Sequence, residues 1–598
     1  MKKFKYIYIL LLFSVSSCQK DILDKKPLDV ISDAIVWEDE KLIEAYLTQA
    51  YLQMYILMNE TPNSLAKDFA SSDDWNGPFI INELADEGTR NWIFGQSEVK
   101  KNGLTINGGV LEWWENSYEV IRTLNELILK VPNAPLEDDF IKKRVAEARF
   151  LRAYNYFAMV KRYGGVPLIT IPQDINASPE ELFPTRNTEQ EVYDFILSEL
   201  DQIKDDLAPR AETDYGRPSK GVVLALKSRA ALYAGSIAKF GEVQINGVVG
   251  INTSLASSYY QKSYDAAREL IESGEYNLYE SDNDKTLNFQ NVFLKKNNVE
   301  VIWAQRHDYV LRSAGGNGWI WDFFQSPKPH PWGAGNQNAP YLEMAEEFEY
   351  VDGSSGTFNR LDLQQKLWTT EDLWKNKDPR FFATLYTQNT NWKGTPVNFQ
   401  NGLILPDGSI MKGGSYMNVP TEGDQKVDNS FGTGFGVLKY LDPSHDIMTG
   451  DRGTSGTDFQ LFRYAEILLN YAEAAFELGR SPDALLAVNE VRERAGIAKL
   501  NSVDREKIRH ERKVELAFEG HRYWDLRRWR IATSLLTVNR SGLQYILDYN
   551  SRKYKLIVLE NYDSGISDPI FYNYNNYFPI TRARTANNPN LVENPGYF

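Results

Sequence analysis

Apolar residues recur at three- and four-residue intervals over long stretches of this 598-residue chain. That spacing places them on one face of an α-helix. Helix-breaking residues close several of the stretches: Pro132 follows the first, and Gly164 with Gly165 follows the second. The pattern predicts helices over residues 113–130, 141–163, 188–207, 220–240, 259–273, 462–478, 481–495 and 504–529.

Two pairs of these predicted helices share one layout. Residues 220–240 are rich in alanine and lead through a glycine break into residues 259–273, and residues 462–478 lead in the same way into 481–495. Small alanines allow the backbones of paired helices to approach closely, as in tetratricopeptide repeats. The layout predicts a mostly α fold built on a tetratricopeptide-like helix-pair scaffold.

Between the helical blocks the chain has a different character. Residues 62–110 and about 300–460 are rich in Gly, Asn, Pro and Trp, and their periodicity is weak. Loops of this length inside a folded protein are usually functional. They predict a loop-rich ligand-binding region inserted between the helical blocks.

The first 17 residues have the pattern of a secretory signal peptide. Three lysines precede an apolar run from Tyr6 to Phe13, and small residues follow. The run is 8 residues long, whereas a membrane span needs about 20. Cys18, the only cysteine, lies where cleavage is expected. The pattern resembles the lipobox of bacterial lipoproteins, with 1–17 removed, Cys18 lipidated and 18–27 forming a tether. The alternative is an ordinary signal peptide with a chance cysteine.

Charge and cysteine content exclude several classes of function. The net charge is −15, and loss of the three lysines of the signal peptide lowers it to −18. Such a chain is a poor partner for nucleic acid or anionic lipid. With one cysteine there is no intramolecular disulfide, and Cys–His catalysis and thiolate zinc sites are excluded from the body. The five histidines lack a metal-binding spacing such as HExxH, so we expect neither a metal nor a cofactor.

Several loops combine flat aromatic side chains with polar ones. Aromatic rings can stack on the C–H face of a sugar, while amides and arginine bond its hydroxyls. The candidate ligand-binding residues are Trp75, Trp92, Trp319, Trp321 and Trp332 for stacking, and Asn76, Arg90 and Asn338 for hydrogen bonding. The alternative for each tryptophan is a hydrophobic anchor that fixes its loop to the scaffold.

The sequence also suggests roles for other tryptophan and histidine side chains. Trp319 and Trp321 are two residues apart and would share one face of an extended segment. The tryptophans on predicted helices are assigned to packing; they are Trp113, Trp114, Trp524 and Trp529. Ligand contact remains open for His307 and His330, whereas His521 is assigned to packing.

A cluster of charges lies in the predicted helix 504–529. On a continuous helix, four charged residues fall within an arc of about 80°: Arg512, Glu515, Glu519 and Arg522. One interpretation makes the two glutamates a glycosidase pair. The other is a structural ion network, which we favour because the arginines would keep both carboxylates ionised and remove the proton donor. No catalytic residue is assigned.

Long segments of the chain resemble one known family. They include AEARFLRAYNYFAMVKRYGGVPLI (146–169), FRYAEILLNYAEAAFELG (462–479), IRHERKVELAFEGHRYWDLRRW (508–529) and the closing FPI…NNPNLVENPGYF. These segments are similar to those of the SusD/RagB family, the surface lipoproteins of Bacteroidetes nutrient-uptake systems. The resemblance implies an N-terminal helical region over 28–300 with ligand loops at 62–110, a ligand-binding region over 301–460 and a C-terminal signature region over 461–598.

The resemblance also implies a function. Family members are not enzymes; they bind an oligosaccharide, or in some branches a peptide, and cover a SusC-like TonB-dependent outer-membrane barrel. The expectation is a cell-surface glycan-binding lipoprotein, anchored in the outer membrane by its lipid and facing the exterior. A peptide-binding RagB-like protein, a surface glycoside hydrolase and a purely structural surface protein remain alternatives.

Overall fold

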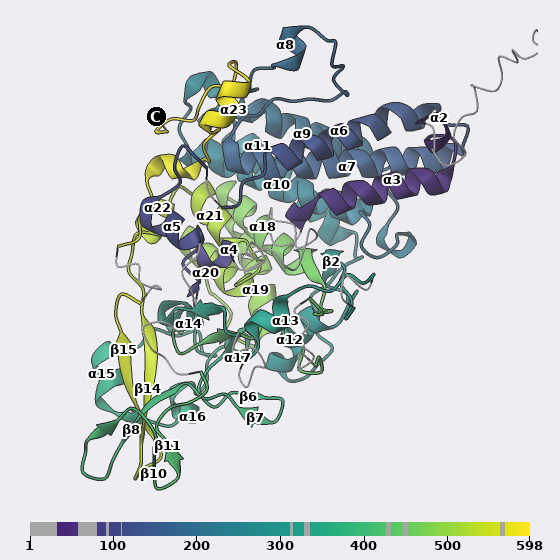
Figure 1. Ribbon diagram of the computed structural model, residues 1–598. Helices are drawn as coiled ribbons and strands as arrows, with labels where there is room; N and C mark the ends of the chain where they lie inside the picture. The colour runs from purple at the N-terminus through teal and green to yellow at the C-terminus, as the bar shows by residue number, and fades with distance from the viewer. Residues whose placement is uncertain are drawn as a thin grey trace, which may run out of the picture.

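The computed structural model describes residues 33–57, 80–90, 95–108, 110–310, 315–327, 335–425, 432–446, 453–562 and 568–597. The predicted signal peptide, the tether and Cys18 lie outside these residues. Long helices gather in a layered bundle, and short helices and strands form a second region beside it (Figure 1). Helices predominate, which confirms the predicted fold class.

Seven of the eight predicted helices are confirmed, with ends that differ by a few residues. They are α6 (Glu115–Lys130), α7 (Asp138–Tyr163), α9 (Glu189–Ile203), α10 (Lys220–Phe240), α11 (Ala256–Glu272), α18 (Tyr464–Glu477) and α19 (Ser481–Ala495). Local signals set their ends. Thr188 and Glu191 form a capping box before α9, and Gly496 adopts a left-handed conformation after α19.

The confirmed helices pack as a continuous series of neighbours. Helix α3 (Glu40–Gln53) lies on α6, α6 on α7, and α7 on α9, and then α10, α11, α18 and α19 follow in contact. A small residue permits the closest of these contacts: a Cβ atom on Gly235 of α10 would lie 3.0 Å from the ring of Tyr260 in α11. The helix-pair layout predicted from the alanine-rich stretches is present.

The prediction of one continuous helix over 504–529 is wrong. The structure has two helices, α20 (Arg505–Glu515) and α21 (Arg522–Arg528). Between them Phe518 and Gly520 have φ values of 61° and 82°, which a helix cannot contain. The Phe518 N–H donates to the Glu87 carboxylate at 2.9 Å, so a distant segment holds the break in place.

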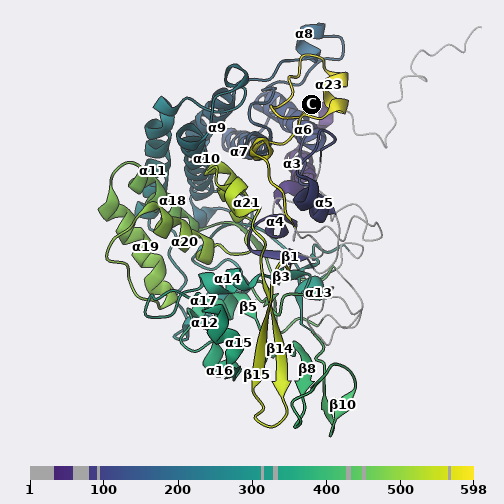
Figure 2. The ribbon, with the colours of Figure 1, turned by 90° about the vertical axis from the view of Figure 1, so that its left-hand side faces the viewer.

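Strands from distant parts of the chain form the sheets of the second region. The largest sheet has the order β4 (Leu367–Trp368), β15 (Tyr554–Leu559), β14 (Gly542–Asp548), β8 (Gln400–Ile404) and β9 (Ile410–Met411). Only the β14–β8 pairing is parallel. A second pair joins β2 (Val301–Gln305) to β13 (Phe459–Arg463), at the base of α18. Figure 2 shows the β14–β15 hairpin extending away from the bundle.

Shorter elements complete the fold. They are α2 (Asp33–Val36), α4 (Ile80–Glu83), α5 (Gly95–Asn102), α8 (Pro179–Leu182), α12 (Lys285–Leu294), α13 (Trp321–Gln325), α14 (Leu342–Glu347), α15 (Arg360–Gln365), α16 (Thr370–Leu373), α17 (Pro379–Thr384), α22 (Ala532–Leu535), α23 (Arg582–Asn587), β1 (Gly88–Arg90), β3 (Asn338–Pro340), β5 (Leu385–Tyr386), β6 (Asn391–Trp392), β7 (Thr395–Pro396), β10 (Ser415–Tyr416), β11 (Val419–Pro420) and β12 (Gly436–Val437). No helix among the described residues is both long and apolar enough to cross a membrane.

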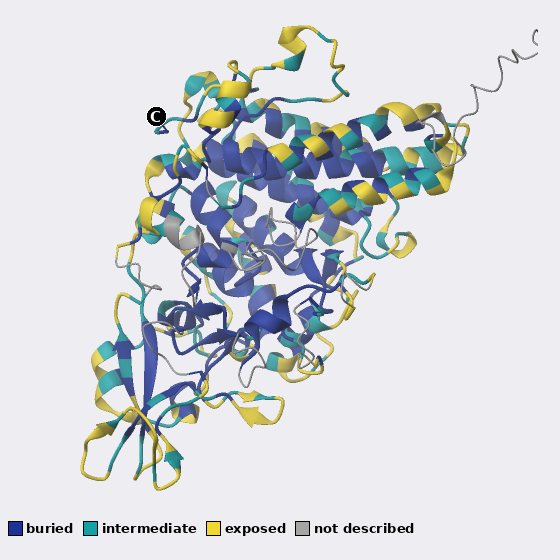
Figure 3. Cartoon of the chain, viewed as in Figure 1, coloured by how far each residue is buried: buried dark blue, intermediate teal, exposed yellow. Residues whose placement is uncertain are grey.

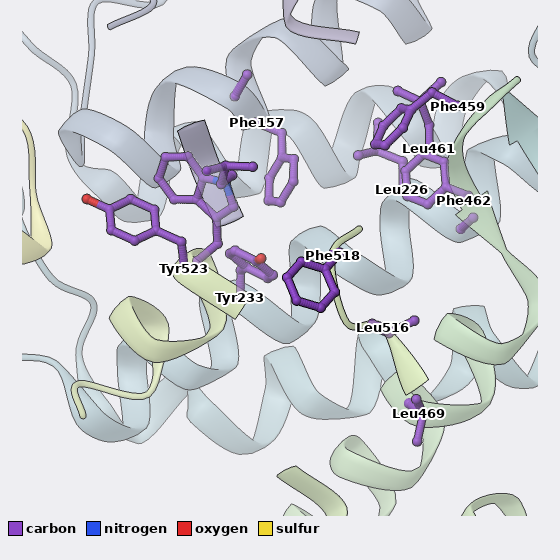
Figure 4. Close-up of a cluster of buried hydrophobic side chains, with 14 of the residues drawn as sticks. Phe157, Leu226, Tyr233, Phe459, Leu461, Phe462, Leu469, Leu516, Phe518 and Tyr523 are labelled. Carbon is purple, nitrogen blue, oxygen red and sulfur yellow. The ribbon is translucent and has the colours of Figure 1, made fainter. Parts of the chain in front are cut away.

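Residues 504–529, called the signature segment below, lie in the hydrophobic core. Leu516, Phe518 and Tyr523 are buried beside Phe157 of α7 and Tyr233 of α10 (Figure 4). Burial is greatest where the bundle meets the second region, and exposed residues collect at the bundle ends and at the tips of the strands (Figure 3). The packing role predicted for four helical tryptophans is confirmed, since all are at least 92% buried: Trp113, Trp114, Trp524 and Trp529.

Candidate functional site

Two loop regions that the sequence marks as ligand-binding meet in a two-stranded antiparallel sheet. Strand β1 belongs to the early loop region and β3 to the later one, and their register pairs Arg90 with Asn338. Figure 2 shows the two strands side by side below α4. Residues opposite each other in an antiparallel pair project from the same face. The fold thus brings together two predicted hydrogen-bonding residues that are far apart in sequence.

Close packing and hydrogen bonds fix the positions of strands β1 and β3. A Cβ atom on Gly88 would lie 2.9 Å from the Ala339 carbonyl oxygen, so the close approach of β1 to β3 requires glycine there. The Asn338 N–H donates to the Gln325 side-chain oxygen of α13 at 3.1 Å. The Gln337 N–H donates to the Phe324 carbonyl at 2.9 Å. Strand β3 is therefore held on both sides, by β1 and by α13.

A cluster of buried amides surrounds this sheet. We define the amide cluster as Asn82, Gln325, Asn336, Gln337 and Asn338, each at most 2% exposed. Within the described residues, no hydrogen-bond partner reaches the amide nitrogens of Asn82, Gln325, Asn336 and Asn338 or the amide oxygens of Asn82, Asn336, Gln337 and Asn338.

Such groups are rare in folded proteins. More than about 90% of buried polar groups make a hydrogen bond, and leaving one without a partner costs about 1–3 kcal/mol. In this part of the fold, β3 and its neighbours hold several donors and acceptors that their own protein does not use. Asn338, which the sequence marks as a candidate, thus carries polar atoms that the described part of the chain leaves without a hydrogen bond.

The charged groups beside the amide cluster are balanced. The Arg90 guanidinium lies 4.0 Å from the Glu83 carboxylate, and both are buried. Burial lowers the pKa of Arg90, and the nearby Glu83 carboxylate partly offsets this. Burial raises the pKa of Glu87 to about 8, which keeps this carboxyl neutral at pH 7.

Asp86 is a strongly ionised carboxylate next to this group. Burial opposes its ionisation, but Arg522 at 2.7 Å and Lys513 at 3.0 Å hold its pKa well below the usual range. Its charge is thus neutralised by two cations from the signature segment. Lys513 also bonds Glu347 at 2.8 Å, so both of these cations have carboxylate partners.

Trp319 and Trp321 do not present an aromatic platform. Trp319 is fully buried and Trp321 is 99% buried. Their rings stack on each other, with centroids 5.2 Å apart, and Trp319 stacks on His307 at 5.1 Å. The Trp321 indole N–H donates to the Lys439 carbonyl at 2.9 Å. No ring face is open to a sugar in this structure, so the placement favours the anchor role over the predicted stacking role.

The two residues also do not lie in one extended segment. Trp319 makes an isolated bridge to Ser455, while Trp321 begins α13. His307 is 97% buried beneath the same stack, and its Nδ1 lies 2.8 Å from the Asn317 carbonyl oxygen. The stack therefore fixes the loop that leads into α13 and β3.

The remaining predicted site residues lie outside the described residues: Trp75, Asn76, Trp92, Trp332 and His330. Conversely, sequence reasoning missed Asn82 and Gln325, which lie in short helices without any distinguishing pattern. Asn336 and Gln337 precede Asn338 directly in the chain, so a polar run of three residues was the available signal.

An ion network holds Glu515 and Glu519, as predicted, but Arg512 and Arg522 are not its cations: Arg512 donates to Asp525 and Arg522 to Asp86, both at 2.7 Å. Arg463 donates to Glu515 and to Glu519 at 2.7 Å, and Arg380 donates to Glu515 at 2.9 Å. Burial by itself would raise the pKa of Glu515 and of Glu519. The surrounding cations, Arg494 foremost for Glu515 and Arg463 for Glu519, hold both below the usual range.

This network has a consequence for catalysis. A glycosidase needs one protonated carboxylic acid to donate to the leaving group. Glu515 and Glu519 are both ionised and both buried, so this pair lacks a proton donor and access to a substrate. The geometry supports the structural interpretation of the pair.

Two family models match the chain. A model of the SusD family matches residues 299–597, and a model described as "Starch-binding associating with outer membrane" matches residues 21–232. The two matches include the strands β1 and β3, and they leave residues 233–298, with α11 and α12, between them.

Individual proteins are similar over most of their length. SusD-like protein P38 of Formosa agariphila is 25% identical, covering 90% of this chain and 94% of that protein. The starch-binding protein SusD of Bacteroides thetaiotaomicron is 24% identical, covering 76% and 72%. The crystal structure of a SusD-like carbohydrate-binding protein from Bacteroides fragilis has the same fold, with a TM-score of 0.68, 22% identity and coverage of 93% and 100%.

Proposed function

We propose, on the premise that this chain belongs to the SusD family, that it captures an oligosaccharide outside the cell and delivers it to a SusC-like TonB-dependent barrel. The observation that carries the proposal is the pairing of β1 with β3, which joins two loop regions around buried amides that lack partners. The names of the related proteins, starch-binding and carbohydrate-binding, support the same class of ligand.

The role we propose is binding without cleavage. Glu515 and Glu519 are held ionised in an ion network, and the Glu83 carboxylate lies 4.0 Å from the Arg90 guanidinium. Stacking and hydrogen bonding leave a glycosidic bond intact. A surface that only holds its ligand suits a protein that passes it on to a transporter.

We propose that the aromatic contacts come from Trp75, Trp92 and Trp332, with Asn76 as a further polar contact. Trp92 follows Arg90 of β1 by two residues, and Trp332 precedes Asn336 by four. These positions flank the two strands that the fold pairs. Arg90 and Asn338 then supply hydrogen bonds from the shared face of the sheet.

The proposed location is the outer membrane, facing the exterior. A lipid on Cys18 would hold the protein there, and residues 18–27 would leave it free to move over the barrel. The description of the family model matched by residues 21–232, which refers to association with the outer membrane, supports this location.

Binding can be tested by affinity electrophoresis against a panel of plant, host and microbial polysaccharides, followed by calorimetry on each positive. We expect Trp92→Ala and Trp332→Ala to weaken binding at least tenfold, since stacking on one ring contributes about 1.5 kcal/mol. Trp368→Ala is the matched control, because this half-buried tryptophan lies on the edge strand β4. Unchanged binding in both loop variants, or binding of no glycan, would refute the proposal.

Delivery needs a separate experiment. Purification of the tagged full chain from detergent-solubilised outer membranes should recover a TonB-dependent barrel in stoichiometric amount. Recovery of the chain alone under conditions that preserve other outer-membrane complexes would contradict the transfer step while leaving the binding proposal intact.

A further inference from the structure

A cavity of about 390 Å³ lies between α6, the segment 167–184 and the C-terminal segment 584–591. Sites for small ligands in proteins measure about 300–1,000 Å³. In Figure 2, α8 and α23, which contribute to the lining, lie above the bundle, whereas β1 and β3 lie below it. The cavity is therefore separate from the site proposed above.

Hydrogen bonds tie the walls of this cavity together. The Tyr118 hydroxyl of α6 donates to the Pro167 carbonyl at 3.0 Å. The Asn588 amide nitrogen of the C-terminal segment donates to the Pro184 carbonyl at 3.0 Å. All three walls are thus held in place within the chain itself. A ligand that enters the cavity does not have to order them, which lowers the cost of binding.

Flat apolar side chains form part of the lining. Three aromatic residues contribute to it: Trp114, Tyr118 and Phe183. Phe183 is 40% exposed and Tyr118 is partly exposed, so both side chains are accessible from solvent. Rings of this kind can stack on the C–H face of a sugar.

Polar side chains line the same cavity. They are Arg122, Gln173 and Asn587, and of these Arg122 and Asn587 are exposed. A side-chain amide both donates and accepts hydrogen bonds, and a guanidinium donates them. Sugar hydroxyls also donate and accept. The lining therefore offers partners for both the apolar face and the polar edge of a sugar ring.

The charged groups of the lining are paired with charges of opposite sign. Arg584 donates to the carboxylates of Glu112 at 2.9 Å and Glu115 at 2.8 Å. The Arg122 guanidinium lies 3.1 Å from the Glu126 carboxylate. Recognition of an acidic ligand relies on a cation that can form charge-assisted hydrogen bonds with it. Because the cations of this lining already face carboxylates, the cavity favours an uncharged ligand.

We propose that this cavity is a second carbohydrate site, which takes a short stretch of neutral sugar. The proposal goes beyond the proposed function, since it assigns a binding site apart from β1 and β3. A long polysaccharide held at both sites leaves the protein more slowly than one held at either site, because its release requires both contacts to open.

Saturation-transfer NMR on the purified protein tests the second site. The probes are the methyl glycosides of glucose, galactose, mannose, xylose and arabinose, with methyl glucuronide as the acidic counterpart. A proline-rich peptide without charged residues is titrated in parallel. We expect at least one neutral glycoside to bind, and we expect neither the glucuronide nor the peptide to bind.

Two variants locate the bound sugar. Phe183→Ala and Asn587→Ala should each weaken binding of the glycoside about tenfold, through loss of one stacking contact or one hydrogen bond. Both residues are exposed, so neither substitution empties the core. Phe382→Ala is the matched control, because this phenylalanine is 39% exposed and lies on α17.

Hydrogen–deuterium exchange gives a readout on the wild-type protein that does not depend on any variant. Adding the glycoside should slow amide exchange in residues 167–184 and 584–591, and exchange in the β14–β15 hairpin should stay unchanged. Slowed exchange that spares both of the first two segments would overturn the second site.

The remaining outcomes separate this proposal from glycan capture near β1 and β3. Glycoside binding that Trp332→Ala abolishes and Phe183→Ala leaves intact would overturn the second site while supporting the first. Binding of the peptide alone, of the glucuronide as tightly as its neutral counterpart, or of no probe at all would also overturn it. Glycan capture itself stands or falls with the polysaccharide panel and the Trp92 and Trp332 variants.

Discussion

Replacing Trp319 by alanine is expected to destabilise the protein without lowering its affinity for a ligand. The side chain is fully buried, stacked between His307 and Trp321, and its ring has no open face. Truncating a buried aromatic side chain to alanine costs about 3–5 kcal/mol, from lost transfer free energy and the cavity left behind. The two stacking contacts place Trp319 toward the upper part of that range.

Urea unfolding followed by far-UV circular dichroism measures the loss, and calorimetry on the folded variant measures ligand affinity. Trp319→Phe is the matched control, because it keeps an aromatic ring in the stack and should lose less than half as much stability. Affinity of the folded Trp319→Ala protein should remain within about twofold of wild type. If stability changed by less than 1 kcal/mol while affinity fell tenfold, the anchor assignment would be wrong and the predicted stacking role would be restored.

Three further predictions concern the tether, the ion network and pH. Cys18→Ala should abolish membrane anchoring while leaving affinity unchanged, as cell fractionation and calorimetry would report; lost affinity in the purified variant would contradict a separate tether. Arg463→Met removes one positive partner from the buried Glu515 and Glu519 carboxylates. It should lower the free energy of unfolding, measured by urea titration, by about 3–5 kcal/mol. A loss under 1 kcal/mol would argue against a cooperative network. Burial raises the pKa of Glu87 from 4.5 to about 8, so the native state holds a proton that the unfolded state releases, and stability falls as pH rises through that window. Glu87→Gln should therefore gain stability relative to wild type between pH 5 and 8, by at most ~1.4 kcal/mol per pH unit, and parallel pH profiles would refute it.

For the signature segment, the prediction that its glutamates are held in ion pairs was correct, but the prediction of one continuous helix was wrong. Periodicity predicted one helix through Phe518, yet the chain turns there with a positive φ. The turn is stabilised by a hydrogen bond from the Phe518 N–H to Glu87, a residue more than four hundred positions away. Glu515 and Glu519 are nevertheless held in an ion network, because buried charges need partners whatever the backbone path. The partner is Arg463 from a distant strand, and not the predicted Arg512 or Arg522, which bond Asp525 and Asp86.

The tryptophans of the loops show a different limit. Composition and spacing marked Trp319 and Trp321 as candidates for stacking on a sugar, and the same features fit an anchor equally well. Only the packing of His307 and Lys439 around them distinguishes the two roles. Burial of a single side chain in a long loop depends on neighbours from elsewhere in the chain, which periodicity does not report.

By itself, the sequence determined the helical scaffold, the family resemblance and the burial of the tryptophans on the predicted helices. These follow from local patterns: apolar spacing, capping residues such as Thr188, and long segments of similar sequence. Only the tertiary structure decided that Arg90 lies opposite Asn338 and that the amides around them lack partners among the residues that the structure describes. Strand pairing between distant segments, and the hydrogen bonds left unmade by it, are set by the packing of the whole fold and not by any stretch of the chain alone.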